Sequence, residues 1–157
     1  MNVYLHIHQL KHQNHIELQD SIRYLYPKKN TIMNGDFTKI LFSKTNVTMN
    51  GLYFYIPFKV YDVNESNHIR YLQTNNTQNI QLKHDLQNIE EQLLKNYMDY
   101  NNMKKKCEYI LSNQLVTNQI RVYRNHDKKT SNKYVIKISG IWETRDKIGI
   151  TYKILEL

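Results

Sequence analysis

The stretch L-Y-F-Y-I-P-F-K-V-Y, residues 52–61, decides the fold that the sequence predicts. Side chains along a strand point alternately to its two faces, so the stretch divides into two sets. One set is apolar and suited to a core, and it consists of Leu52, Phe54, Ile56, Phe58 and Val60. The other set is aromatic and basic, and it consists of Tyr53, Tyr55, Pro57, Lys59 and Tyr61.

The second face of this strand is unusual because three tyrosines and a lysine lie on it in register. Flat rings beside a positive charge suit an unpaired nucleic-acid strand, whose bases stack on rings while its phosphates meet cations. Tyrosine is also common in strands for its packing alone, and a second layer of structure would then cover this face. The stretch by itself leaves both interpretations open.

Length and charge bound the class of protein. The 157 residues match one ordinary domain, and 40% hydrophobic and 11% aromatic content is typical of a globular protein. Alanine is absent while Asn, Ile, Lys and Tyr abound; these four have AT-rich codons, so part of the bias reflects the genome. The 22 Lys and Arg against 14 Asp and Glu give a formal charge of +8, which favours nucleic acid first and acidic membrane surface second.

Cysteine content and hydropathy indicate the compartment. Cys107 is the one cysteine, which excludes an intramolecular disulfide and fits a reducing environment. Residues 1–9 carry two histidines and no long apolar core, so no signal peptide is predicted. No window reaches the ~18 apolar residues that span a bilayer. We expect a soluble intracellular protein, cytoplasmic or nuclear, with no membrane partner.

Alternation and turn signals predict the other elements around the central stretch. Further strands are predicted at residues 3–8, 37–43, 119–125, 134–143 and 148–155. Asn50-Gly51 is a turn signal, so the strand at 37–43 and the central stretch are expected to form an antiparallel hairpin. Less regular segments are a short strand or helical turn at 21–26, a polar loop at 9–20 and a long loop with at most one short strand at 64–78.

One long helix is predicted over residues 80–115, with Asn79 as its N-cap. Apolar residues recur along it at helical spacing, namely Leu82, Leu86, Ile89, Leu93, Tyr97, Tyr100, Cys107 and Leu111. Such a helix would extend about 50 Å, longer than a small sheet covers. It therefore either breaks near Asn101-Asn102 or projects and packs on a partner.

The later strands add basic and aromatic residues to the surface predicted for the central stretch. Candidate nucleic-acid contacts there are Arg121, Tyr123, Lys137 and Lys153, with Lys128, Lys129 and Lys133 in a basic turn. If the strands form one curved sheet, these residues join the tyrosine face and bind phosphates without sequence preference. The alternative is an ordinary solvated face that is rich in lysine.

No catalytic or metal site is predicted, so we expect a non-enzymatic protein without a cofactor. His-x-His in a strand can hold zinc, but nothing completes a ligand set for His6, His8, His12 and His15. Cys107 is expected to be an inert core residue, and Glu90 and Glu91 are expected to be solvated charges. No motif for nucleophilic catalysis or for cradling a phosphate occurs, and Asp36, Asp62 and Glu143 are too scattered for a nuclease centre.

The predicted order of strands, with one helix between the third and fourth and a closing hairpin, resembles the OB-fold. That fold is a mainly antiparallel barrel of five strands, here five or six, which commonly binds single strands. The resemblance covers the whole chain, residues 1–157, as one α+β domain. It implies stacking residues and phosphate contacts at Tyr53, Tyr55, Tyr61, Lys59 and Arg121.

A second resemblance concerns the run Y-V-I-K-I-S-G-I-W-E-T-R-D-K-I-G-I-T-Y-K, residues 134–153. It looks like the ends of small proteins of AT-rich large DNA viruses and virus-like linear plasmids, several of which are assumed to be replication accessory proteins. Trp142 within this run is expected to lie in the core.

Together these features predict a protein that coats single-stranded DNA during replication by stacking on tyrosines and by phosphate contacts. Nothing in the sequence addresses the 2′-hydroxyl, so RNA remains open as a partner. The alternative is a structural or assembly subunit of a viral-type replication or transcription complex. It would form an oligomer through the helix at residues 80–115 and use the tyrosine face as a protein interface.

Overall fold

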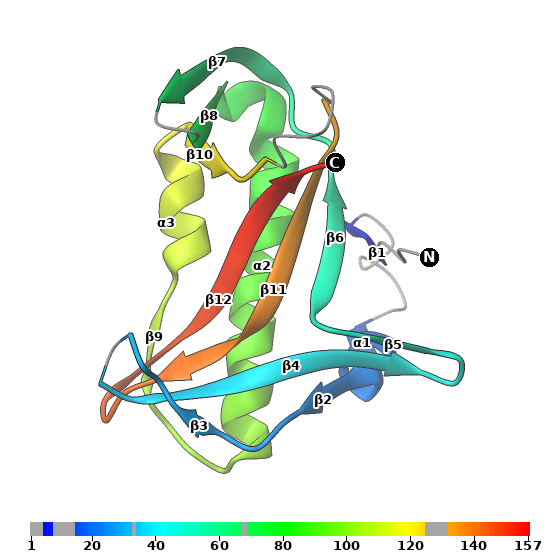
Figure 1. Ribbon diagram of the computed structural model, residues 1–157, viewed down its shortest axis with the longest axis vertical. Helices are drawn as coiled ribbons and strands as arrows, with labels where there is room; N and C mark the ends of the chain where they lie inside the picture. Colours follow the sequence, from blue (N-terminus) through cyan, green and yellow to red (C-terminus); the bar gives the residue numbers. More distant parts are fainter. Residues whose placement is uncertain (1–4, 8–14, 33, 67–68, 125–131) are drawn as a thin grey trace.

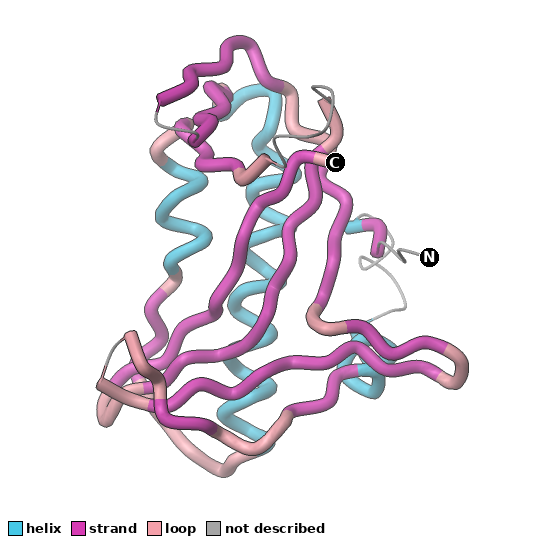
Figure 2. Tube along the Cα trace, viewed as in Figure 1, coloured by secondary structure: helices cyan, strands magenta, loops and turns pink. Residues whose placement is uncertain are grey.

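The computed structural model describes residues 5–7, 15–32, 34–66, 69–124 and 132–157, and its fold is mixed α+β with mainly antiparallel strands (Figures 1 and 2). Along the chain the elements are β1 (Leu5–His6), α1 (His15–Ser21), β2 (Ile22–Tyr24), β3 (Lys28–Lys29), β4 (Asp36–Lys44), β5 (Val47–Met49), β6 (Leu52–Ile56), β7 (Val60–Ser66), β8 (Ile69–Thr74), α2 (Asn76–Tyr100), β9 (Lys106–Glu108), α3 (Ile110–Val116), β10 (Gln119–Val122), β11 (Tyr134–Glu143) and β12 (Lys147–Glu156).

Strand β11 is the centre of the main sheet because both of its edges are paired. One edge pairs antiparallel with β12. The other edge is shared, since residues 134–138 pair with β6 and residues 140–143 pair with β4. A register irregularity between Ile138 and Gly140 marks the change of partner. Short parallel strands extend the sheet, β1 beside β6 and β9 beside β12.

Strand β4 takes part in two groups of strands. Its first half pairs with β11 and β3, and its second half pairs with β2 and β5. Figure 1 shows β4 running across the lower ends of β11 and β12. Among the described strands the main path ends at β1 and β9, and no pairing joins these edges. The expected OB-fold barrel is therefore not confirmed, because the sheet is open.

The predicted hairpin between the strand at 37–43 and the central stretch is wrong. β4 turns back into β5, and β6 pairs with β1 and β11 instead. Gly51 is at the point where β5 passes into β6, with φ of +127°. A Cβ there would lie 2.8 Å from the carbonyl oxygen of Ile138. The Asn50-Gly51 signal thus marks a bend between sheet partners, which only glycine accommodates without strain.

The central stretch is not one strand, because it breaks at Pro57. β6 ends at Ile56, the amide of Phe58 donates to the Ile56 carbonyl at 3.0 Å, and β7 starts at Val60 in a different sheet. Proline supplies no amide for a ladder, which explains the break. The apolar set is confirmed as core, since Leu52, Phe54, Ile56 and Phe58 are buried and Val60 packs partly buried against them.

The predicted helix at 80–115 is two shorter helices. α2 ends at Tyr100, Asn102 adopts a left-handed conformation with φ of +48°, and the chain forms β9 before α3. The break near Asn101-Asn102 is thus the alternative that the structure supports. Cys107 lies partly buried in β9 rather than on a helical stripe. With α2 limited to 25 residues, or about 37 Å, it lies against one face of the main sheet (Figure 1).

The N-cap of α2 is Asn75, whose side chain accepts from the amide of Gln78 at 2.8 Å. Asn79, predicted as the cap, is buried inside the helix. Its side chain accepts from the Lys59 amide at 2.8 Å and donates to the Lys59 carbonyl at 2.9 Å. This pair of bonds fixes the connection between β6 and β7 to the start of the helix.

The polar segment at 64–78 is not a loop. It contributes to the antiparallel strands β7 and β8, which form a three-stranded sheet with β10. Arg70 on β8 is buried and donates to both carboxylate oxygens of Glu156 on β12, at 2.7 and 2.5 Å. This buried ion pair connects the small sheet to the main sheet.

Glu90 is completely buried, so its assignment as a solvated charge is wrong. Its carboxylate accepts from the amides of Leu111 and Ser112 at 3.0 and 2.9 Å, and from the Ser112 hydroxyl at 2.6 Å. The side chain of one helix thereby satisfies the free amides at the start of the next. Glu91 is exposed, as predicted.

The amino-terminal region is described only in part. The predicted strand at 3–8 is present as β1, within its described residues, and residues 15–21 form α1 instead of a loop. The side chains of His6, His8, His12 and His15 lie outside the description. Among the side chains that are described, no group of three or more His, Cys, Asp or Glu residues is placed to hold a metal ion. Within the same ranges, no helix combines the length and apolar character needed to cross a bilayer.

Candidate nucleic-acid interface

The face of the main sheet turned away from α2 carries a line of tyrosine and basic side chains. Strand register places Lys137 on β11 directly between Tyr53 on β6 and Lys153 on β12. The alternation of β6 explains this placement, because Leu52, Phe54 and Ile56 fill the core from the opposite face. The hairpin of β11 and β12 and the sequence-distant strand β6 therefore contribute to one line across the sheet.

Tyr123 and Arg121 extend this line beyond β12. The Lys153 ammonium lies 5.2 Å from the centre of the Tyr123 ring, and the Arg121 guanidinium lies 4.9 Å from the centre of the same ring. Within the line itself, the Lys137 ammonium lies 5.4 Å from the centre of the Tyr53 ring. Cations at this distance are attracted to the ring faces. We call this set the tyrosine–cation row: Tyr53, Lys137, Lys153, Tyr123 and Arg121.

Main-chain hydrogen bonds hold Tyr123 beside β12. Its amide donates to the Ile154 carbonyl at 2.8 Å, and its carbonyl accepts from the Glu156 amide at 3.0 Å. Arg121, two residues before Tyr123, lies in β10, where it pairs with Tyr71 of β8. The end of the small sheet thus adds a ring and a cation to a row built on the main sheet.

Tyr55 faces the same side as Tyr53 but has different neighbours. It lies opposite Val135 of β11, which is completely buried. Tyr55 itself is half-buried. The buried Val135 shows that this end of the face is covered, as the packing interpretation of the tyrosines requires. In the row, Lys153 is exposed, and Tyr53, Lys137, Tyr123 and Arg121 are half-buried.

Other predicted contacts lie apart from the row. Lys59 and Tyr61 follow Pro57 and line a cleft of about 440 Å³ with Val63 and Asn132. Lys133 is exposed at the start of β11, where its carbonyl accepts from the Leu157 amide. Lys128 and Lys129 fall outside the described residues.

Trp142 is buried, as expected, but its ring lies over Gly149 of the neighbouring strand β12. A Cβ at Gly149 would lie 2.4 Å from that ring, so glycine is what allows the indole to lie flat against the strand. The indole is therefore a packing residue and not part of the row.

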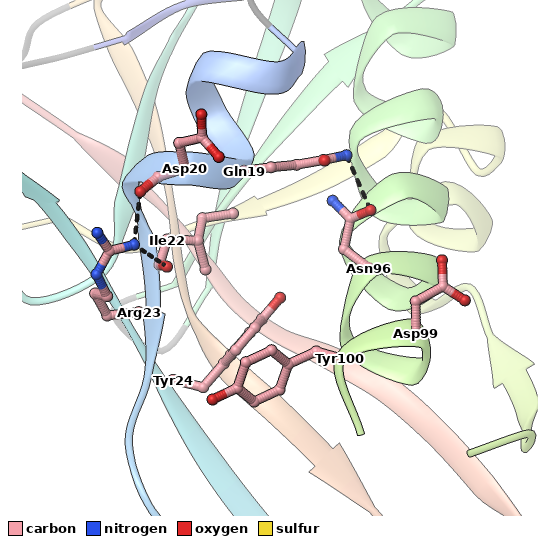
Figure 3. A pocket seen from close by; sticks show the side chains of 8 residues that line it. All are labelled: Gln19, Asp20, Ile22, Arg23, Tyr24, Asn96, Asp99 and Tyr100. Atoms are coloured by element: carbon pink, nitrogen blue, oxygen red, sulfur yellow. Dashed lines mark hydrogen bonds between the residues drawn. The ribbon is translucent and has the colours of Figure 1, made fainter. Parts of the chain in front are cut away.

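The structure has a cavity of about 640 Å³ that the sequence does not predict (Figure 3). Its lining comes from α1, β2 and the end of α2, and comprises Gln19, Asp20, Ile22, Arg23, Tyr24, Asn96, Asp99 and Tyr100. No local pattern relates residues 19–24 to 96–100, because only the tertiary fold brings them together. Tyr100, which the sequence placed on the apolar stripe of the helix, is 71% exposed at this cavity.

No protein-family model matches this chain, and searches of curated proteins and of solved structures also found no match.

Proposed function

We propose that this protein binds single-stranded nucleic acid, with single-stranded DNA as its first partner, and that it does so without catalysis. The observation that carries the proposal is the tyrosine–cation row, in which Lys137 and Lys153 lie between the rings of Tyr53 and Tyr123, and Arg121 lies beside Tyr123. Bases stack on such rings irrespective of sequence, at ~1–3 kcal/mol per base. Phosphates meet the cations between them.

The charge of the chain supports the same partner. The formal charge is +8, and Lys153 in the row is exposed to solvent. Affinity that depends on such cations falls steeply with salt because binding releases counterions. A role in coating strands during DNA replication is part of this proposal, as is an open arrangement related to the OB-fold, with a helix between the early and late strands.

The direct test is a titration of the protein with fluorescent oligo-dT and with a duplex of equal length, each at two salt concentrations. We expect tight, salt-sensitive binding that prefers oligo-dT. Equal and weak binding to both nucleic acids would overturn the proposal, because it would reflect only non-specific attraction to a basic protein. Oligo-rU in a parallel titration separates RNA from DNA preference.

A second candidate function is that of an assembly subunit. The observation favouring it is the groove of about 450 Å³ between α2 and α3, which is bordered by Ile80 and Val116. These apolar side chains are 68% and 72% exposed. Self-association that is independent of DNA and is lost in the double variant Ile80→Glu, Val116→Glu would support this function.

A further inference from the structure

The cavity between α1, β2 and the end of α2 has a chemistry opposite to that of the whole chain. Two acidic residues line it, Asp20 and Asp99, together with one basic residue, Arg23. Neither carboxylate takes part in an ion pair among the described residues. The guanidinium of Arg23 donates to the main-chain carbonyls of Asp20 and Ile22, at 2.6 and 2.9 Å. Two carboxylates against one guanidinium leave a surplus of one negative charge here, on a protein whose formal charge is +8.

Aromatic rings form one wall of the same cavity. The ring centres of Tyr24 and Tyr100 lie 5.0 Å apart at an angle of 48°, and Tyr24 also makes a T-shaped contact with Tyr97 at 5.2 Å between ring centres. Figure 3 shows both rings on one side of the space, with Gln19 and Asn96 reaching across the opposite side. The side-chain amide of Gln19 donates to the side-chain oxygen Oδ1 of Asn96 at 3.0 Å, and this bond connects α1 to α2.

We propose that this cavity binds a guanidinium or alkylammonium side chain presented by a basic segment of a partner protein. Ring faces attract such a cation, and the carboxylates of Asp20 and Asp99 complement its charge. The methylene stem that an arginine or lysine carries would pack on the rings of Tyr24 and Tyr100, because the Ile22 side chain is almost completely buried. A nucleic-acid strand is disfavoured, because its phosphates would approach two carboxylates.

The site is independent of the proposed nucleic-acid interface. α1, β2 and α2 contribute none of the residues of the tyrosine–cation row. The two proposed sites therefore share no residue, and occupation of one does not use a side chain of the other.

The experiment is an NMR titration of the full chain with N-acetyl-arginine-N-methylamide. Citrulline in the same blocked form is the matched probe, because it has nearly the same shape and no charge. We expect the arginine probe to shift the side-chain amide signals of Gln19 and Asn96 and the ring signals of Tyr24 and Tyr100. The citrulline probe is expected to leave them in place.

Two variants test the assignment to this cavity. Asp99→Asn is expected to weaken binding of the arginine probe about fivefold, a change typical of losing one exposed charge partner. Glu91→Gln removes an exposed carboxylate from the same helix and is expected to bind as the unchanged protein does. A dispersed spectrum in each variant establishes that it is folded.

Four results would overturn the proposal. The first three are the absence of any shift with arginine, equal shifts with arginine and citrulline, and unchanged binding in Asp99→Asn together with Asp20→Asn. The fourth is binding of spermidine without binding of the arginine probe, since the site would then accept a polyamine and not a protein side chain.

Discussion

Lys137 on β11 holds its ammonium group 5.4 Å from the ring centre of Tyr53 on the neighbouring strand β6. The contact places the ammonium beside the ring, and Lys137 takes part in none of the ion pairs among the described residues. A base stacks on this ring face once the ammonium moves off it, and the displaced ammonium is then free to meet a phosphate. The repetition of this arrangement at Lys153 and Tyr123 makes the row testable residue by residue.

Replacement of Tyr123 by Ala should weaken binding to oligo-dT about five- to 150-fold, which corresponds to the ~1–3 kcal/mol of one stacked base. Tyr61→Ala is the matched control, because Tyr61 is 68% exposed but lies on β7 outside the row. Fluorescence anisotropy measures both affinities. A Tyr61 variant that loses as much affinity as the Tyr123 variant would contradict the assignment of stacking to the row.

Replacement of Lys153 by Gln should lower the dependence of affinity on salt. Loss of one phosphate contact reduces the slope of log K against log salt by about 0.7 for a single strand. Lys28→Gln removes an exposed lysine from β3 and should leave the slope unchanged. The measurement is a series of titrations over several salt concentrations, and equal slopes in all three proteins would show that Lys153 meets no phosphate.

Replacement of Glu90 by Gln should destabilise the fold by about 1–3 kcal/mol, because a buried amide cannot replace both acceptor oxygens at the start of α3. The adjacent Glu91→Gln should change stability by less than about 0.5 kcal/mol, as is usual for exposed positions. Urea unfolding followed by circular dichroism gives both values. Similar losses for the two variants would show that the Glu90 contacts contribute little.

Stability should fall at alkaline pH, and Tyr24 should account for part of the fall. Burial, followed by the neighbouring Tyr97 and Tyr100, raises the pKa of Tyr24 to about 12. A pKa that is higher in the folded state means that the unfolded chain loses its proton first. The contribution is therefore complete below pH 10 and is lost as the pH rises through about 12. Tyr24→Phe should show a smaller decline over this window, measured by urea unfolding at each pH.

The predicted and observed strands agree well in three places. The run at 134–143 coincides with β11, the run at 148–155 lies within β12, and Leu52, Phe54 and Ile56 face the core as expected. In β6 one apolar face settles the register, so a local pattern is sufficient. In β11 the apolar run predicts the strand but not its register irregularity between Ile138 and Gly140.

The local sequence pattern fails to predict burial where a charged residue pairs with a partner far away in the sequence. Arg70 occupies a core-facing position of β8, and only Glu156, near the other end of the sequence, makes its burial tolerable. Glu90 likewise looks like a surface charge until α3 supplies its amides. Helical spacing also continued from Tyr100 to Cys107 and Leu111 by coincidence, although Asn102 turns the chain between them.

The candidate interface was predictable in composition and not in arrangement. Tyr53, Lys137, Lys153, Tyr123 and Arg121 were all among the expected contacts. Their adjacency follows from the register of β11 and from the main-chain bonds of Tyr123, neither of which a single strand reveals. Lys59 and Tyr61 do not lie on the same surface, because the strand breaks at Pro57 and the next strand, β7, belongs to another sheet.

The shared edge of β11 has a consequence during protein synthesis. β4 and β6 leave the ribosome well before β11, the strand with which both of them pair. Until that strand emerges, the nascent chain holds two apolar strands whose principal partner does not yet exist, a state prone to association with other chains. Pairing at such long sequence separation is also slow to form. We therefore expect the growing chain to depend on chaperones until its last strands are translated.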